Sequence, residues 1–375
     1  MTYKTKLKTE QFFYGLLTFF GFALIGGVAG FFIGKIQKQM NLEGVYFIVI
    51  ALLVLTLLFL IYTINIFLHE IGHLIFGLLS GYEFNSIRFG KLMLIKENGK
   101  LRFCKYNLPG TGGQCIMTAP NVDAQNLKVV LYNLGGLFVN ILILVIFGAL
   151  FFAFKETLTV ASMIFFMFSS TSLLILITNG LPFSQMGTDG ANTIILYKDK
   201  NARLAFKNQL EIVKYLSKNY SLLEMPKDLF TFDKSIPLTN PLITSQAINY
   251  YNYLSLNKMY ADAKETALFI LENAKSINNI HQKILYGELL FIAAVIEKDN
   301  EAAKKIFTEH KKELLQGAGF ISIQRYLYAY YSLVEIDEKK AKNYAKMFEA
   351  SLKNYPYPKD AKLEKEQFDM VKQGE

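Results

Sequence analysis

Cysteine and histidine are both scarce in this chain. Its 375 residues include two cysteines, Cys104 and Cys115, and both lie in one short predicted loop. Two cysteines so placed do not indicate a disulfide framework, and a pair separated by ten residues is too little for a structural zinc site. We therefore expect two free thiols in a loop that faces the cytosol.

Charge is also low, and it lacks the pattern of a nucleic-acid surface. Charged residues make up 19% of the chain, and Lys and Arg exceed Asp and Glu by 40 to 31. The sequence has no basic stripe interleaved with stacking aromatics, which argues against a nucleic-acid partner. Hydrophobic residues make up 52%, the mean hydropathy is +0.25, and the apolar residues concentrate before about residue 196. The composition predicts a membrane protein with a soluble part.

Four apolar runs are long enough to cross a bilayer. They cover residues 12–34, 45–79, 129–154 and 158–181. The first run follows three lysines and resembles a signal peptide, but it lacks a convincing cleavage site, so we interpret it as an uncleaved helix. The second would form a helix of about 52 Å against a hydrocarbon core of about 30 Å. It must therefore tilt, protrude or loosen near Gly72 and Gly77.

Lysine and arginine are distributed unevenly among the segments that connect these runs. The N-terminus, residues 81–128 and the chain after residue 198 are rich in them, whereas the other two connections hold only Lys35, Lys38 and Lys155. Positive residues favour the cytoplasmic side of a membrane. We expect a multi-pass protein of a bacterial plasma membrane, with both termini and the middle connection in the cytoplasm.

One short string near the cytoplasmic end of the second run carries chemistry. It reads His69-Glu70-Ile71-Gly72-His73 and lies in an apolar stretch. On a helix the two histidines fall about 40° apart and can hold one metal ion. They could instead be satisfied core residues, but an unpaired glutamate among leucines and phenylalanines is costly unless it has a function. The pattern indicates a zinc site in which Glu70 takes a proton from a zinc-bound water.

A zinc site open for catalysis needs a third protein ligand. Asp189 is the best candidate because it follows the fourth run at the same membrane face as the histidines. Pro182 should end the preceding helix, and Gly187 and Gly190 free the backbone to aim the carboxylate inward. A plain turn aspartate would fit the local sequence equally well, and only the histidine pair on the same side favours the ligand. Four other residues are less well placed, namely His281, His310, Glu156 and Glu83.

These strings together resemble the site-2 protease family of intramembrane zinc metalloproteases. The family pattern is H-E-x-x-H in one span and N-x-x-P followed by Asp-Gly in a later one, and here the strings are HEIGH at residues 69–73 and NGLPFSQMGTDG at residues 179–190. LPGTGG at residues 108–113 is similar to a glycine-rich loop of the family, and GGLFVN at residues 135–140 to its small-residue motif. The resemblance covers roughly residues 45–195. In the second motif Thr188 replaces a usual leucine, and about two extra residues precede Asp189.

The resemblance implies a specific set of site residues. His69, His73 and Asp189 would hold one Zn²⁺ per chain, and Glu70 would act as general base and later protonate the leaving amine. Asn179 matches the family asparagine that binds the substrate carbonyl or the developing oxyanion, although it could equally cap the fourth helix. The other motif residues are Gly112 and Gly113, which could let an extended substrate approach or could form an ordinary turn, and Gly135, Gly136 and Asn140, which we expect to serve helix packing.

The second half of the chain is predicted to be a helical domain. From about residue 201 the sequence is amphipathic, and a weak repeat places Ala263, Ala303 and Ala341 at spacings of 40 and 38 residues. This period suggests helical hairpins similar to tetratricopeptide repeats, with a concave face for a protein partner. A helical bundle that caps the membrane domain fits equally well, and the tyrosine-rich stretches favour core over binding surface.

The fold class predicted from the sequence is mainly α. It comprises a membrane helix bundle of about four spans with a small re-entrant or β-like loop, residues 1–196, and a cytoplasmic helical-hairpin domain, residues 201–375. Two functions fit this organisation. The first, which we favour, is an intramembrane metalloprotease that cuts a membrane-spanning protein or peptide, and the second is a membrane scaffold or transport accessory with a structural zinc site. Glu70 separates them, because a purely structural site needs no carboxylate beside its first histidine.

Overall fold

The computed structural model describes residues 3–41, 44–106, 112–157, 159–184 and 187–374. The chain divides into two compact units. The first, here called the membrane unit, comprises Met1–Tyr82 and Lys128–Lys198. The second, called the sheet-and-helix unit, comprises Glu83–Leu127 and Asp199–Glu375.

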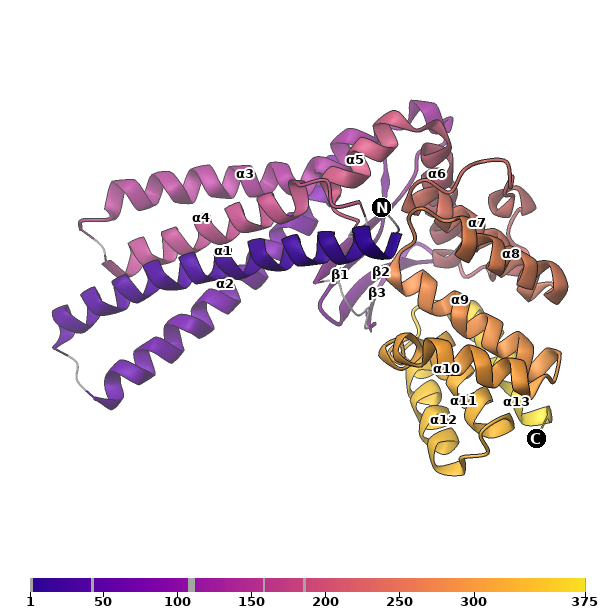
Figure 1. Ribbon diagram of the computed structural model, residues 1–375. Coiled ribbons are helices and arrows are strands. Elements are labelled where there is room, and N and C mark those ends of the chain that lie inside the picture. The colour runs from indigo at the N-terminus through magenta and orange to yellow at the C-terminus, as the bar shows by residue number, and fades with distance from the viewer. Residues whose placement is uncertain (1–2, 42–43, 107–111, 158, 185–186, 375) are drawn as a thin grey trace. The chain divides into compact units, whose positions relative to one another are not determined.

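The membrane unit is built from long apolar helices that run alongside one another (Figure 1). They are α1 (Tyr3–Met40), α2 (Val45–Leu79), α3 (Val129–Phe154) and α4 (Thr159–Gly180), followed by the short α5 (Asp189–Lys198). Among the described residues, four helices of this unit are long and apolar enough to cross a membrane, the number that the sequence predicts. The observed bounds of α2 and α3 coincide with the predicted ones. Neither run contains a proline, α3 has no charged residue, and α2 has none before His69, so nothing interrupts the helices.

Close helix packing in the membrane unit depends on small and polar residues. A Cβ atom added to Gly72 on α2 would strike the backbone carbonyl of Gly135 on α3, and a Cβ on Gly135 would strike that of Gly72. The Asn65 amide donates to the carbonyl of Phe168 at 3.0 Å and to the Thr171 hydroxyl at 2.6 Å, which joins α2 to α4. Such contacts replace the hydrophobic effect, which does not drive helix association in lipid. The helix α2 continues unbroken through Gly72, so it does not loosen there.

The segment after α2 forms a four-stranded antiparallel sheet in the sheet-and-helix unit. Its strands are β1 (Glu83–Phe89), β2 (Leu92–Glu97), β3 (Lys100–Lys105) and β4 (Gly113–Thr118), in the order β3-β2-β1-β4. Asn98 and Gly99 both have positive φ, as a two-residue hairpin turn requires. The sequence predicted only a small β-like loop here, and the structure shows a complete sheet. Residues 108–111 of the predicted glycine-rich loop lie outside the described part of the chain.

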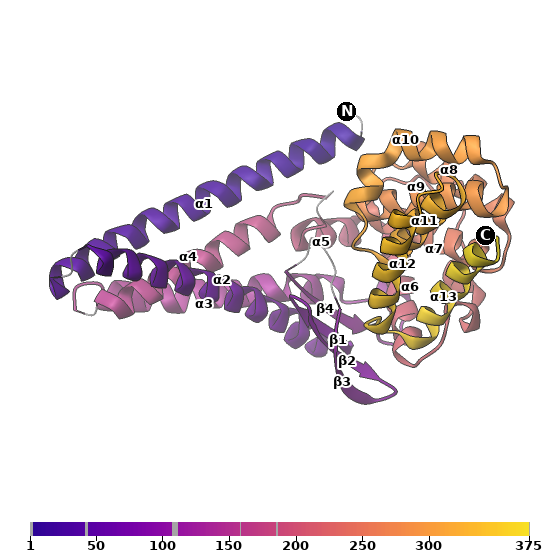
Figure 2. The ribbon, with the colours of Figure 1, turned by 90° about the horizontal axis from the view of Figure 1, so that it is seen from below.

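Helices make up the remainder of this unit (Figure 2). They are α6 (Lys200–Ser217), α7 (Pro241–Leu256), α8 (Tyr260–Asn273), α9 (Asn279–Phe291) with the π-helical η4 (Ile292–Ile296), α10 (Asn300–Gln316), α11 (Ile321–Leu333), α12 (Glu338–Lys353) and α13 (Pro358–Gly374), with short 3₁₀ turns at Ala124–Asn126, Leu222–Glu224 and Lys227–Phe230. Several begin at a side chain that accepts hydrogen bonds from the first free N–H groups, namely Asp199, Asn240, Asn278, Asp299 and Asp337.

Successive helices pack as the pairs α7–α8, α9–α10 and α11–α12. Ala263, Ala303 and Ala341 are buried at matching positions in the second helix of each pair. Five residues earlier in each case, Lys258, Lys298 and Ile336 have φ values of 61°, 53° and 57°. The three connections therefore share one left-handed turn residue at the spacing of the weak sequence repeat. A relationship to tetratricopeptide repeats stays a prediction.

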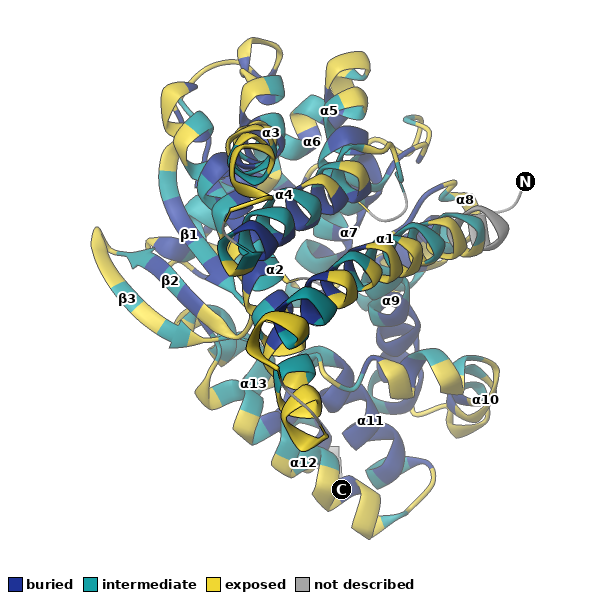
Figure 3. Ribbon diagram, turned by 90° about the vertical axis from the view of Figure 1, so that its left-hand side faces the viewer, coloured by how far each residue is buried: buried dark blue, intermediate teal, exposed yellow. Residues whose placement is uncertain are grey.

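The core of these helices is aromatic. Tyr326, Tyr328, Tyr330 and Tyr331 on α11 are all buried, and Figure 3 shows α11 as almost wholly buried. The tyrosine-rich stretch is therefore core, as its sequence favoured. The predicted domains, 1–196 and 201–375, differ from the two compact units chiefly at residues 83–127, and their functional division stays a prediction.

Candidate active site

The two motif histidines project from one face of α2 and nearly touch. His69 is 4% exposed and His73 is 8% exposed, and their Nε2 atoms lie 3.1 Å apart. This proximity follows from their spacing of four residues, which places side chains one above the other on a helix. Gly136 on α3 makes room for the ring of His69, because a Cβ atom at this position would overlap the imidazole.

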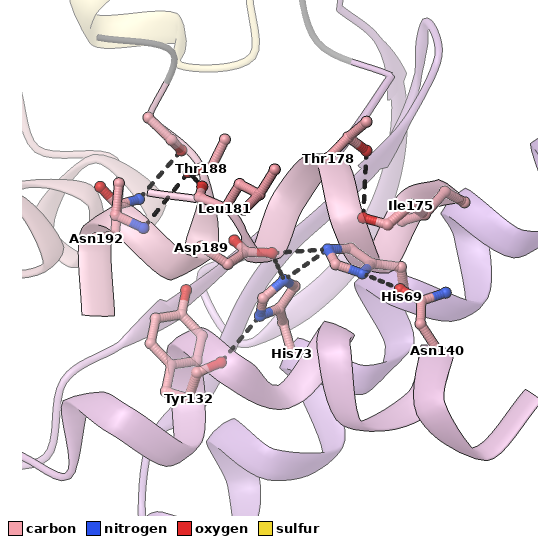
Figure 4. A network of polar contacts seen from close by, with 12 residues as sticks. His69, His73, Tyr132, Asn140, Ile175, Thr178, Leu181, Thr188, Asp189 and Asn192 are labelled. Carbon is pink, nitrogen blue, oxygen red and sulfur yellow. Dashed lines mark hydrogen bonds and ion pairs between the residues drawn. The ribbon is translucent and has the colours of Figure 1, made fainter. Parts of the chain in front are cut away.

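Each imidazole is held by a hydrogen bond at its other nitrogen (Figure 4). His69 Nδ1 lies 2.6 Å from Asn140 Oδ1, and His73 Nδ1 lies 2.9 Å from the backbone carbonyl of Tyr132. Both partners are acceptors, so each Nδ1 carries the proton and each Nε2 lone pair points toward the other histidine. The orientation of Asn140 is fixed in turn, because its amide donates to Ser172 Oγ at 3.0 Å while that hydroxyl donates to the Asn140 carbonyl at 3.0 Å.

The third member of the cluster comes from the start of α5. The preceding helix α4 ends at Gly180, just before Pro182, as predicted. The Thr188 hydroxyl donates to the carbonyl of Leu181 at 2.6 Å and accepts a hydrogen bond from the Ala191 N–H. A Cβ atom on Gly190 would overlap the carbonyl of Gly180, so only glycine fits there. These contacts hold the first residue of α5, Asp189, against the histidines.

The three side chains converge on one point. Asp189 Oδ2 lies 3.0 Å from His69 Nε2 and 3.5 Å from His73 Nε2. These are the edges expected of a tetrahedral zinc site, about 3.3 Å when each ligand bond is about 2.0–2.1 Å. Among the described residues, this is the group of His, Cys, Asp and Glu side chains that could hold a metal ion. Two neutral imidazoles and one carboxylate are also a donor set that zinc prefers. The imidazoles are oriented by the hydrogen bonds at Nδ1, and the carboxylate is positioned by the turn before α5.

The carboxylate of Asp189 is poised as an anion. Burial would raise the pKa of Asp189, but positive charge and hydrogen-bond donation from His73 and His69, which both have in the protonated state, together lower it below its ordinary value. A deprotonated carboxylate is the form that binds a cation. The charge state therefore agrees with a metal-ligating role.

Glu70 lies on the same part of α2 and is 8% exposed. It follows His69 directly in the helix and is close enough to His73 to interact with it electrostatically. Few positions in an apolar span would tolerate such a carboxylate, since burying a charge without compensation is unfavourable. Its role as general base stays a prediction.

Other predicted site residues are not part of this cluster. Asn179 is half-buried in the last turn of α4, and within the described residues no hydrogen bond joins it to the histidines or to Asp189. Gly112 and Gly113 belong to the sheet-and-helix unit, where the Gly112 carbonyl accepts from the Gly90 N–H and Gly113 pairs with Phe89. Their expected roles toward substrate stay predictions.

Sequence reasoning underestimated two positions. Asn140 was expected to serve helix packing, and it orients His69 as well. A buried asparagine in an apolar span was itself the available signal, since polar side chains at that depth are usually functional. Thr188 was noted only because it departs from the family pattern, and in this structure its hydroxyl fixes the turn before Asp189. Gly135 serves helix packing, as we expect from the sequence, because it allows the close approach of α3 to α2.

Four helices that could cross a membrane and a cluster that could hold a metal ion are the features of a membrane metalloprotease, and the family match gives the same class. The chain belongs to peptidase family M50, the site-2 protease family, whose family model matches residues 56–346. The match covers most of the chain and includes the HEIGH string, Asp189 and most of the helical pairs. No curated protein and no solved structure matches the chain.

Proposed function

We propose that this protein is an intramembrane zinc metalloprotease that hydrolyses peptide bonds in membrane-embedded segments of proteins or peptides. One observation carries the proposal: three lone-pair donors, from His69, His73 and Asp189, converge within 3.5 Å of one another beside Glu70. Membership of peptidase family M50 supports the general activity. The substrate, the cut site and the roles of individual residues belong to the proposal.

His69, His73 and Asp189 would hold one zinc ion per chain. When bound, Zn²⁺ supplies Lewis-acid chemistry that lowers the pKa of a water and polarises a peptide carbonyl. Asn140 and the Tyr132 carbonyl keep both imidazoles in the tautomer with a free Nε2 lone pair. They act as positioning groups, because they touch the ligands and not the reacting atoms.

Glu70 moves the proton in this proposal. As general base it takes a proton from the attacking water, and as general acid it delivers that proton to the nitrogen of the departing amine. Asn179 would donate a hydrogen bond from its amide to the substrate carbonyl oxygen as negative charge develops there. A glutamate serves this shuttle better than a glutamine, since only the carboxylate can accept and release the proton.

The substrate must present an unwound segment. A peptide bond inside a helix is shielded by its own hydrogen bonds, so we expect helix-breaking residues near the cut site. The edge strand β4 offers one means of holding an extended chain, because within the described strands it pairs only with β1. Strand addition at Gly113 would satisfy the backbone of an unwound substrate. We place the active-site side and both termini in the cytoplasm, on the distribution of lysine and arginine.

Co-expression with tagged single-span peptides tests the proposal. A panel with and without a glycine-proline pair in the cytoplasmic half of the span would be expressed with the wild type, with Glu70→Gln and with Glu83→Gln. Glu83 is exposed on β1 and serves as the matched control. We expect cleavage of the helix-broken peptides by the wild type and by Glu83→Gln, and none by Glu70→Gln. An identical cleavage pattern for Glu70→Gln and the wild type would reject the protease and leave a scaffold with a structural metal site.

A further inference from the structure

The sheet-and-helix unit contains a cavity of about 680 Å³. Its lining comes from the end of the sheet and from α7, α9, α11, α12 and α13. This volume lies in the range of small-ligand and peptide sites. Neither the proteolytic chemistry nor the metal cluster uses it.

Two contacts join the sheet to the helices beside the cavity. Arg102 on β3 donates to the carbonyl of Pro356 at 2.8 Å, in the connection between α12 and α13. The ring of Tyr106, just after β3, packs edge-on against Tyr355 with centroids 6.2 Å apart. The sheet wall and the helical wall are therefore joined by hydrogen bonding and aromatic packing, and the cavity is a feature of one compact unit.

A buried arginine forms part of the lining, and its charge is already balanced. Arg325 on α11 is 1% exposed, with Nε donating to Glu364 at 3.1 Å and Nη2 lying 3.6 Å from Glu288. The Tyr326 hydroxyl also donates to Glu288. The guanidinium of Arg325 stacks over the rings of Phe291 and Tyr326, with its central carbon 4.7 Å and 4.6 Å from the two ring centroids. Two carboxylates thus surround one cation. The Nη1 atom of Arg325 has no hydrogen-bond partner among the described residues, and a backbone carbonyl of a bound peptide would satisfy it.

Asp360 adds a third carboxylate to the lining. It accepts a hydrogen bond from the Tyr355 hydroxyl at 2.9 Å, and no basic group among the described residues lies within ion-pair distance of it. Burial and the nearby charge of Glu364 raise the pKa of Asp360 to about 6. Lys91 and Lys105 reach the cavity from the sheet, but both are exposed and neither pairs with a carboxylate in the described part of the chain.

An unpaired amide oxygen points to the same kind of ligand. Gln324 is 3% exposed and lines the cavity, and its amide nitrogen donates to the Ala318 carbonyl at 2.9 Å. Its Oε1 atom has no hydrogen-bond partner among the described residues. A buried acceptor without a donor is unfavourable, and a ligand that brings N–H groups would satisfy it. Carboxylates and this amide together call for a donor-rich, positively charged group.

We propose that the cavity binds an arginine or lysine side chain of a peptide segment, with the cationic group at Asp360 and beside Glu364. These two residues lie four apart on α13 and so present their carboxylates on one face. Tyr326 and Tyr355 supply aromatic surface that favours a cation. The inference rests on the proposed function in naming the segment: membrane proteins carry Lys and Arg beside their spans on the cytoplasmic side, and the cavity would hold that part of a substrate.

Peptide binding to the full-length protein tests this directly. The Glu70→Gln variant in detergent would be titrated with fluorescein-labelled twelve-residue Gly-Ser peptides that carry a central Arg-Lys, Gln-Gln or Glu-Glu pair, with binding read as fluorescence anisotropy. We expect the Arg-Lys peptide to bind about tenfold or more tightly than the Gln-Gln peptide, and the Glu-Glu peptide to bind most weakly. Rising salt should weaken the Arg-Lys peptide and not the Gln-Gln peptide.

Two substitutions on α13 separate a specific site from general charge. Asp360→Asn keeps a hydrogen-bond acceptor for Tyr355 and removes the charge, and it should weaken the Arg-Lys peptide about tenfold. Asp369→Asn removes an equal charge on the same helix, where Asp369 pairs with Lys365 outside the cavity, and should leave binding unchanged. If Asp360→Asn fails to fold, judged by thermal unfolding, the peptide charge series on the parent protein still decides.

Three results would overturn the proposal. These are equal binding of the three peptides, unchanged binding in Asp360→Asn, and tightest binding of the Glu-Glu peptide, which would assign the cavity to an anionic partner through Lys91 and Lys105. Because the parent variant lacks Glu70, binding is measured without cleavage. Failure of the protease proposal therefore leaves this result intact, and failure of the cavity proposal leaves Glu70-dependent cleavage intact.

Discussion

The two units each bury a group of charged side chains, and these groups are built in opposite ways. In the membrane unit, the donors of His69, His73 and Asp189 converge on one point, which suits an added cation. In the sheet-and-helix unit, the cation is part of the chain, because Arg325 lies against Glu288 and Glu364. Three donors that converge on one point bind a metal ion tightly. In the second unit Arg325 already neutralises much of the charge of Glu288 and Glu364, so Asp360 is the carboxylate left to attract a cationic ligand. We therefore expect tight metal binding in the first unit and modest peptide selection in the second.

Removal of the third donor should give the largest effect. Asp189→Ala leaves two histidines, too few for a stable catalytic zinc site, so the purified variant should lose nearly all of its zinc and all of its cleavage. Zinc per chain measured by elemental analysis checks this. Asp123→Ala, at an exposed aspartate outside the cluster, should keep full zinc occupancy. Full occupancy and activity in Asp189→Ala would remove Asp189 from the site.

Loss of the partner of His69 should have a smaller effect. Asn140→Leu deletes the acceptor that holds Nδ1 at 2.6 Å, and such partners commonly change metal affinity by about 10–100-fold. Asn133→Ala removes a buried asparagine on the same helix whose amide bonds only its own turn, and it should leave zinc affinity unchanged. Competition with a zinc chelator measures both. Equal affinity in Asn140→Leu and the wild type would reduce Asn140 to a packing residue.

The charge of Asp360 should make the sheet-and-helix unit less stable as the pH rises. A folded pKa of about 6, above the unfolded value of about 3.9, means that the folded protein binds more protons between these values. The free energy of unfolding then falls between about pH 4 and pH 6, by up to about 3 kcal/mol if the full shift applies. Asp360 faces Glu364 on α13, Tyr355 and Tyr106, and burial keeps the pKa of both tyrosine hydroxyls above the ordinary tyrosine value, far above this range.

Thermal unfolding of Asp360→Asn checks this sign. The variant should have a higher Tm than the wild type at pH 7.5, and the difference should disappear below about pH 4, where the wild-type carboxyl is protonated in both states. A lower Tm at pH 7.5 would show that an unseen cation stabilises the carboxylate in the folded protein.

The turn before Asp189 should give the smallest effect. Thr188→Leu restores the residue usual in the family but removes the hydroxyl bonded to Leu181 and Ala191, a loss of about 1 kcal/mol for a helix cap. We expect cleavage to fall by about fivefold with Thr188→Leu and to be kept with Thr188→Ser, because serine preserves the hydroxyl. Activity of Thr188→Leu equal to that of the wild type would show that the turn is held by other contacts.

The sequence predicted the membrane unit better than the other unit, for a physical reason. Spans are continuous apolar runs and the H-E-x-x-H string is local, so both can be read within one helix. Asp189 lies 116 residues after His73, and the order of the four predicted spans is what places it on the same side of the membrane as the histidines. The sequence predicts only a β-like loop where the structure has a sheet, because strands of six or seven residues are too short to show a clear hydrophobic period.

The cavity could not be predicted from local pattern at all. Glu288, Arg325, Asp360 and Glu364 come from three helices, and each looks like an ordinary surface charge in its own stretch of sequence. Only tertiary packing makes them neighbours. The role of Asn140 was missed for a related reason, since its partner His69 lies on another helix 71 residues earlier.

The most direct test of the central claim measures zinc and cleavage in the same samples. Wild type and Glu70→Gln, purified side by side, would be assayed for zinc per chain and for cleavage of a helix-broken single-span peptide. We predict one zinc ion in each protein and cleavage by the wild type alone, because Glu70 moves protons and is not a ligand. Cleavage by Glu70→Gln at the wild-type rate would contradict the account.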